Sequence, residues 1–179
     1  EQVLALATAE TKARHADWKA KRVSTVARAI TFAALKYSML RVDPDKPVVF
    51  DVKEALAFDG MSGPYLLYMI ARGKTLLGKA KEGYALSAHG LARPEEKTLL
   101  RELALYPEVV ALTASDLMVS RLAQFLFGLA QSFSRFYAEV PVLAEGDIRI
   151  RAERLALVSA VVETLENGLG ILGIETLDE

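Results

Sequence analysis

Residues 60–72 read GMSGPYLLYMIAR and contain the clearest helix start in the chain. Ser62 or Gly63 can cap a helix here. Pro64 suits the first helical position, because the N–H group that proline lacks would have no partner inside the helix at that point. We therefore predict a helix that begins at Pro64 and continues to about Ala80.

The sequence on both sides of this helix predicts more helices and no sheet. Long stretches rich in Ala, Leu, Arg, Glu and Lys carry apolar residues at spacings of three and four, which is typical of amphipathic helices. The run PVVFD is treated as a connector, because one strand cannot form a sheet without a partner. The expected fold is an all-α helical bundle. The other expected helices cover residues 2–20, 21–40, 94–105, 107–119, 120–137 and 150–166, the last of them closed by Asn167-Gly168.

Composition excludes several classes of protein. The 179 residues are 52% hydrophobic and 25% charged, which is typical of a folded domain. No apolar run reaches the roughly 18 residues needed to cross a bilayer. The chain has no Cys, so disulfides, thiolate metal sites and Cys nucleophiles are excluded. His15 and His89 alone are too few for a multi-histidine metal site or a catalytic triad built on histidine.

Charge is unevenly distributed along the chain although the total is −1. Residues 11–41 hold eight basic side chains and one acid, a net charge of +7. Residues 61–93 hold five basic side chains and one acid, a net charge of +4, whereas residues 155–179 carry five acids and no base. Such segregation indicates either a face that meets phosphate or solvated helix faces, and both interpretations stay open.

One segment and several ordered blocks resemble arginyl-tRNA synthetases. The segment FDVKEALAFDGMSGPYLLYMIAR, residues 50–72, resembles the family pattern in which a Gly-Pro-Tyr helix start is followed two turns later by Ala-Arg. Three downstream blocks follow in the family's order, at residues 92–110, 121–143 and 151–174. Upstream, residues 26–42 resemble the helix that follows the catalytic core. The resemblance covers roughly residues 23–174 and identifies the chain as a C-terminal anticodon-binding region of this class I family.

This resemblance implies an organisation and a function. We expect residues 59–179 to form the anticodon-binding helical bundle, and residues 1–58 to form a helical segment that joins it to the catalytic domain of the same chain. The expected partner is the anticodon stem-loop of arginine tRNA, bound in the cytoplasm for ATP-dependent arginylation by the full-length enzyme, with no membrane or DNA contact.

Catalysis is expected to lie outside these residues. Neither a HIGH-like nor a KMSKS-like signature occurs in the chain, so it is predicted to be non-catalytic alone. ATP and Mg²⁺ are expected in the full-length enzyme, with no cofactor held by the present residues. The start at Glu1 instead of Met is interpreted as a cut point.

The resemblance also implies a site. Tyr65 and Arg72 are expected to meet the anticodon loop, where the family reads the middle cytosine. Residues seven apart lie on the same helix face, so an aromatic ring and a guanidinium can bracket one unpaired base. Spacing alone favours a core tyrosine at Tyr65 and a surface ion-pair partner of Asp59 or Glu82 at Arg72, and the resemblance reverses this preference. Tyr68 either extends the contact or packs inward.

Further candidates lie outside this helix. Tyr137 matches a family position near the anticodon loop, with Arg135 as a phosphate contact. His15 and Trp18 either face the inner corner of the tRNA or pack between helices, and His89 receives no role. The remaining aromatics of the QFLFGLAQSFSRF block are predicted to be core, because they follow a buried helical stripe: Phe125, Phe127, Phe133 and Phe136.

The chain departs from the family in three places. Leu67 stands where the family usually has Gln, and Met69-Ile70 stand where it has Ala-His. The family generally ends in a Met a few residues after the Leu-Gly-Ile block, and this chain ends at Glu179, so a terminal contact with the anticodon is expected to be missing. The acidic last segment and the total charge motivate an alternative function, a helical interaction or scaffolding domain without direct anticodon reading.

Overall fold

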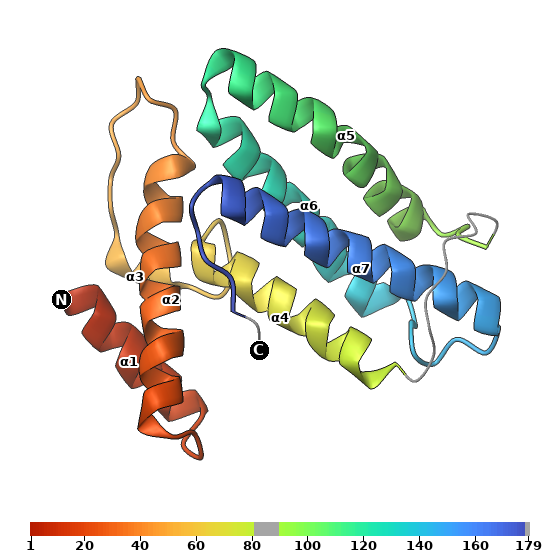
Figure 1. The fold of residues 1–179 in the computed structure, drawn as a ribbon, viewed down its shortest axis with the longest axis horizontal. Helices are drawn as coiled ribbons and strands as arrows, with labels where there is room; N and C mark the ends of the chain where they lie inside the picture. Colours follow the sequence, from red (N-terminus) through yellow and green to blue (C-terminus); the bar gives the residue numbers. More distant parts are fainter. Residues whose placement is uncertain (81–89, 178–179) are drawn as a thin grey trace.

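The computed structural model describes residues 1–80 and 90–177, and within them it contains seven α-helices and no β-strand. The predicted all-α fold is confirmed (Figure 1). The predicted connector at residues 47–51 contains no regular element. The helices are α1 (Gln2–Arg14), α2 (Ala20–Leu40), α3 (Val52–Leu56), α4 (Gly63–Lys79), α5 (Pro94–Asp116), α6 (Val119–Glu139) and α7 (Ile148–Ile171).

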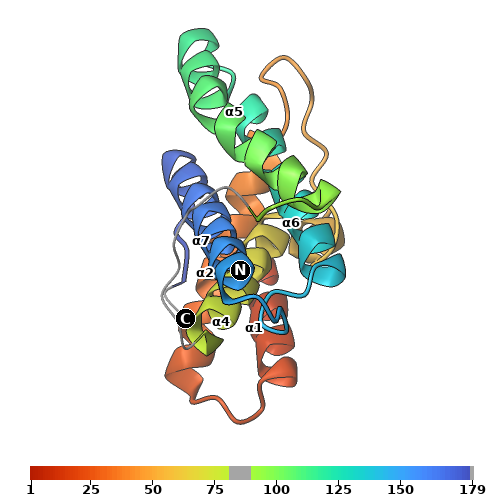
Figure 2. The same cartoon turned by 90° about the vertical axis from the view of Figure 1, so that its right-hand side faces the viewer.

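Helices α4, α5, α6 and α7 form a bundle, and the α1–α2 pair lies at one end of it (Figures 1 and 2). Helix α2 packs against α1, α3 and α4, and also touches α6. The main core fills the bundle and includes Leu66, Met69 and Phe133, each at most 1% exposed. A smaller cluster between α1, α2 and α3 includes Ala27 and Ile30. Burial of the main core stabilises the bundle, and burial of the smaller cluster stabilises the packing of α1, α2 and α3.

The start of α4 follows the sequence prediction closely. The Ser62 hydroxyl accepts a hydrogen bond from the Tyr65 backbone N–H at 3.1 Å, so Ser62 is the N-cap. Pro64 occupies the first turn. A Cβ atom added to Gly63 would collide with the backbone carbonyl of Ala33 in α2. The Gly-Pro pair therefore lets the N-terminus of α4 approach α2 closely, which fixes where the rest of α4 points.

Two predicted helix ends were wrong. Helix α5 continues through Pro107, where a break was predicted between residues 105 and 107. Apolar side chains on both sides of Pro107, including Leu103 and Val110, pack against the main core, and this packing offsets the lost backbone hydrogen bond. Helix α7 continues past Asn167-Gly168 to Ile171, because Gly168 packs directly on Leu126 of α6.

The N-terminal region also differs from the prediction. The first helix ends at Arg14 instead of near residue 20, and residues 15–19 form a turn before α2. The rings of His15 and Trp18 stack in this turn, with centroids 3.8 Å apart and planes 11° apart. The short helix α3 was not predicted. The Asp51 side chain caps it by accepting a hydrogen bond from the Glu54 N–H at 2.9 Å.

A buried ionic network fastens the bundle at its far end. Arg154 of α7 is paired with Glu96 of α5 at 2.6 Å and with Glu145 of the α6–α7 connection at 2.5 Å. Glu96 is fully buried and its other oxygen accepts a hydrogen bond from the Arg93 N–H. Arg154 therefore ties three segments to each other.

Across residues 1–80 and 90–177, no helix is long and apolar enough to cross a membrane.

Candidate nucleic-acid interface

Helix α4 has one face in the core and one face toward solvent. Leu66, Met69 and Ile70 are at most 2% exposed and bury the inner face. Tyr65, Tyr68 and Arg72 follow each other at spacings of three and four, so they form one stripe on the other face. Tyr65 and Arg72 are half-buried, and the Tyr68 residue is 44% exposed. The predicted arrangement of a tyrosine and an arginine on one accessible face is present.

Tyr137 of α6 completes this group. The guanidinium carbon of Arg72 lies 3.9 Å from the centre of the Tyr137 ring and 5.9 Å from the centre of the Tyr68 ring. The Tyr137 ring is held edge-to-face on the buried Phe133 ring at 6.3 Å. A guanidinium over an aromatic face is attracted by the negative face of the ring. Tyr137 thus orients Arg72 from a neighbouring helix.

Arg72 keeps its hydrogen-bonding capacity. Within residues 1–80 and 90–177, no hydrogen bond or ion pair joins its guanidinium to another residue. Asp59, one of the two ion-pair partners considered from the sequence, is not bonded to it; the other, Glu82, lies outside the described residues. A guanidinium carries five N–H donors and no acceptor. The site therefore presents an oriented set of donors beside two aromatic faces.

Tyr65 is the more enclosed aromatic of the stripe. Its ring meets the Phe127 ring of α6 at 5.7 Å, edge to face, and its hydroxyl lies 3.4 Å from the Ala130 carbonyl oxygen. Burial raises the pKa of the Tyr65 phenol, and a hydrogen bond from Ser134 and the positive charge of Arg72 oppose this shift. Tyr65 is thus a neutral phenol at the edge of the site, with its O–H directed to the Ala130 carbonyl oxygen.

The other candidate residues lie elsewhere. Arg135 is exposed, and its charge acts on the Glu102 carboxyl of α5, whose pKa is raised chiefly by burial. No contact joins it to the α4 stripe within residues 1–80 and 90–177, and its role as a phosphate contact stays a prediction. His15 and Trp18 line a hollow between the α1–α2 pair and α4, and Tyr68 of the stripe lines the same hollow. His89 lies outside the described residues.

Sequence analysis did not select two residues that support the site. Phe127 packs on Tyr65, and Ser134 acts to lower the pKa of the Tyr65 phenol. Their spacing could have indicated them, because Ser134 follows Phe127 by seven positions and precedes Tyr137 by three. These spacings place all three residues on one face of α6. Of the four phenylalanines predicted to be core, Phe133 and Phe136 are fully buried, and Phe125 and Phe127 are partly buried against the core.

A comparison with known protein families identifies the family to which this chain belongs. Residues 66–179, more than half of the chain, match the model of the DALR anticodon binding domain. The chain belongs to the DALR anticodon-binding domain family. The matched part includes Tyr68, Arg72 and Tyr137 and begins immediately after Tyr65.

Individual relatives agree with this membership. The chain is 37% identical over 160 residues to an arginine–tRNA ligase of Bdellovibrio bacteriovorus, and 36% identical over 157 residues to that of Ignicoccus hospitalis. These alignments cover 88% of this chain but 28% and 25% of the relatives. The resemblance to arginyl-tRNA synthetases expected from the sequence is confirmed.

Solved structures give the same relationship for the fold. The arginyl-tRNA synthetase of Thermus thermophilus superimposes with a TM-score of 0.87 at 32% sequence identity, over 99% of this chain and 31% of that one. The Plasmodium falciparum arginyl-tRNA synthetase has the same fold, with a TM-score of 0.80. The all-α architecture described above is therefore that of the corresponding third of these larger chains.

Proposed function

We propose that this chain is the part of an arginine–tRNA ligase that binds the anticodon loop of arginine tRNA. The observation that carries the proposal is the Arg72 guanidinium, oriented on Tyr137 at 3.9 Å with its N–H donors directed to no described residue. Membership of the DALR anticodon-binding domain family supports it. Tyr65 and Tyr68 supply the aromatic surface on which an unpaired base stacks, as is common in recognition of RNA loops. Tyr137 contributes by holding the Arg72 guanidinium over its ring.

The chemistry of the site favours cytosine over uracil, and we take this base to be the middle one of the anticodon, as the resemblance to arginyl-tRNA synthetases implies. The Watson–Crick edge of cytosine presents two neighbouring acceptors, O2 and N3, and a guanidinium presents only donors. Uracil carries a hydrogen on N3, so the same approach places a donor against a donor. A base stacked on an aromatic ring contributes roughly 1–3 kcal/mol, and the hydrogen bonds from Arg72 add selectivity to this affinity.

Aminoacylation itself is proposed to require the rest of the larger enzyme. Within residues 1–80 and 90–177, no cluster of three or more His, Asp or Glu side chains is arranged to hold a metal ion. In this proposal ATP and Mg²⁺ are bound by the catalytic domain of the same chain. The present domain contributes tRNA binding and selection, and its compartment is the cytoplasm.

The proposal is tested by titrating the chain with a fluorescent arginine tRNA and with the same tRNA carrying uridine at the middle anticodon position. We expect tighter binding of the cytosine form and a steep loss of affinity as salt rises, because phosphate contacts dominate the affinity of proteins for nucleic acids. Equal affinity for the two tRNAs would overturn the assignment of specificity. Self-association without any tRNA binding would instead support the alternative of a scaffolding domain.

A further inference from the structure

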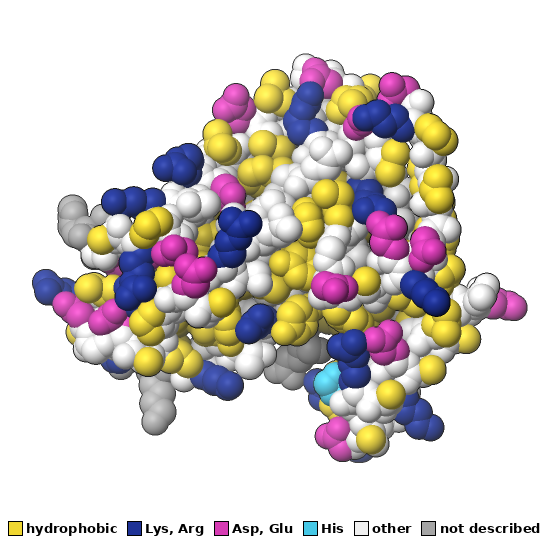
Figure 3. All heavy atoms as spheres, turned by 180° about the vertical axis from the view of Figure 1, so that it is seen from behind, with side chains coloured by type: hydrophobic (Ala, Val, Ile, Leu, Met, Phe, Trp, Pro, Cys, Tyr) yellow, Lys and Arg dark blue, Asp and Glu magenta, His cyan; other side chains and the backbone are white. Residues whose placement is uncertain are grey.

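A basic groove follows the outer face of α2, and none of the side chains of the Arg72 site lines it. Its volume is about 970 Å³, and it is closed on one side by residues 175–177 near the end of the chain. The lining contains one acid, Glu175, and five basic side chains: Lys19, Lys21, Arg22, Arg28 and Lys36. All five basic residues are exposed. On the face seen from behind, basic and acidic side chains are interspersed over the molecule (Figure 3).

The positive charge of this groove is not neutralised within the described part of the chain. None of the five basic side chains forms an ion pair with a carboxylate of residues 1–80 or 90–177. Lys36 donates a hydrogen bond to the Gly173 carbonyl, which leaves its charge uncompensated. By contrast, Arg14 pairs with Glu10, and Lys74 pairs with Glu166. The groove is therefore complementary in charge to an anionic partner.

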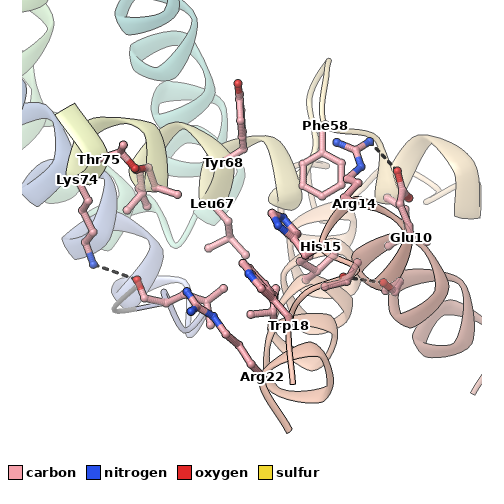
Figure 4. A pocket seen from close by; sticks show the side chains of 18 of the residues that line it. Glu10, Arg14, His15, Trp18, Arg22, Phe58, Leu67, Tyr68, Lys74 and Thr75 are labelled. Carbon is pink, nitrogen blue, oxygen red and sulfur yellow. Dashed lines mark hydrogen bonds and ion pairs between the residues drawn. The ribbon is translucent and has the colours of Figure 1, made fainter. Parts of the chain in front are cut away.

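One of the groove's cations is held in a fixed position. The guanidinium carbon of Arg22 lies 4.3 Å from the centre of the Trp18 ring, and Trp18 is stacked on His15. Figure 4 shows these three side chains together beside α4, with Leu67 of α4 directed toward Trp18. A pre-oriented guanidinium loses less side-chain entropy when it binds a phosphate than a free one does. Trp18 is itself half-buried against the cluster between α1, α2 and α3, which holds the ring in place beneath Arg22.

The groove adjoins a second hollow that extends to Tyr68, next to Arg72. This hollow, about 850 Å³ in volume, lies between the α1–α2 pair and α4. Arg22, Val26 and Leu177 line both hollows. The second hollow extends to Tyr68, whose ring is 5.9 Å from the Arg72 guanidinium. The cations of α2 and the Arg72 site therefore lie beside neighbouring hollows, within reach of one extended molecule.

We propose that the α2 groove is a second RNA-contact surface, which binds the sugar-phosphate backbone of the same tRNA whose loop base is held at Arg72. The inference rests on the proposed function. Contacts to phosphates position a nucleic acid and add affinity, but they carry no sequence information directly. The groove therefore raises the affinity for tRNA without affecting which base is preferred at the middle anticodon position.

The test is a double substitution, Lys21→Ala with Arg28→Ala, in the chain as it exists. Both side chains are exposed on a helix, and Ala is favourable there, so folding is retained. We expect the affinity for whole arginine tRNA to fall roughly tenfold near 0.1 M salt, and the plot of log affinity against log salt to become shallower by about 1–2 units. The ratio of affinities for the cytosine and uridine tRNAs stays the same.

A matched control, Lys97→Ala with Arg101→Ala, removes two exposed cations from α5, which line neither hollow. It is expected to change the affinity and the salt slope much less. If the wild-type chain binds the tRNA and the groove variant binds it equally well, the groove inference is wrong and the proposed function stands. If the wild-type chain binds no tRNA, the proposed function fails first. A groove variant that alters the cytosine preference would also overturn the inference.

Discussion

The guanidinium of Arg72 in α4 lies 3.9 Å from the centre of the Tyr137 ring in α6. These residues are 65 positions apart in the sequence, and the packing of the two helices brings them together. The contact fixes a charged, planar donor group at the surface while leaving its N–H groups available. Because α4 and α6 both belong to the main core, the position of the site depends on how that core packs.

The aromatic face of Tyr137 is predicted to matter more than its hydroxyl. Tyr137→Phe keeps a ring beneath Arg72, and its affinity for arginine tRNA is expected to match that of the wild type. Tyr137→Leu removes the cation–π contact, which contributes about 1 kcal/mol, and the expected loss of affinity is roughly fivefold. Titration of both variants with labelled tRNA checks this. Equal binding by the Leu variant would show that Tyr137 does not orient the arginine.

Gly63→Ala is predicted to destabilise the fold by about 1–3 kcal/mol, the usual range for overpacking. The added methyl would collide with the Ala33 carbonyl, which is backbone and cannot rotate away. Gly78→Ala is the control, because nothing lies within 4 Å of its new Cβ atom and Ala favours the helix. Urea unfolding of both variants gives the comparison. Similar midpoints for the two would contradict the close approach of α4 to α2.

Arg154→Met is predicted to lower the free energy of unfolding by about 3–5 kcal/mol, because it leaves the fully buried Glu96 carboxylate without its charged partner. Adding Glu96→Gln should restore part of the loss, since a neutral amide is less costly to bury and still accepts the Arg93 N–H. Arg149→Met is the control, because that side chain is 83% exposed. Thermal unfolding measures all three, and a mild effect of Arg154→Met would mean that the network is solvated.

The free energy of unfolding is predicted to fall in acid partly because Glu145 becomes protonated. Its pKa lies below the ordinary value, chiefly because its carboxylate accepts the Asp147 backbone N–H and also pairs with Arg154. A carboxyl with a lowered folded-state pKa stabilises the fold at pH above its unfolded pKa, and this contribution disappears as pH falls through the folded value. Glu145→Gln should therefore be less stable than wild type at neutral pH, with the difference shrinking in acid. A constant difference across pH would contradict this linkage.

The start of α4 and the shared face of Tyr65 and Arg72 were predictable because their signals were local. Ser62, Gly63 and Pro64 mark a helix start by their own backbone chemistry, and the seven-residue spacing places Tyr65 and Arg72 on one face. The identity of the ring beneath Arg72 was not derivable from spacing. Tyr137 entered only through family resemblance, and the packing of α4 on α6 determines its contact with Arg72.

The helix ends were predicted wrongly where tertiary packing extended a helix or where no local signal marked a turn. Pro107 and Gly168 are local signals for helix ends, but the side chains around them pack against the core and the helices continue. The turn after Arg14 contains neither Gly nor Pro, so no local signal marked it. Helix α3 did have a signal, since Asp51 and Glu54 stand three apart as in a capping box.

The most direct test of the account is a thermodynamic cycle that combines Arg72→Ala with the change of the middle anticodon base from cytosine to uridine. Four affinities are measured with whole arginine tRNA: wild type and variant, each with both bases. We predict that the base change weakens tRNA binding by the wild type markedly more than binding by the variant. The expected coupling free energy between Arg72 and the base is about 1–3 kcal/mol. If the two changes are instead additive, Arg72 does not read that base, and the central claim is contradicted.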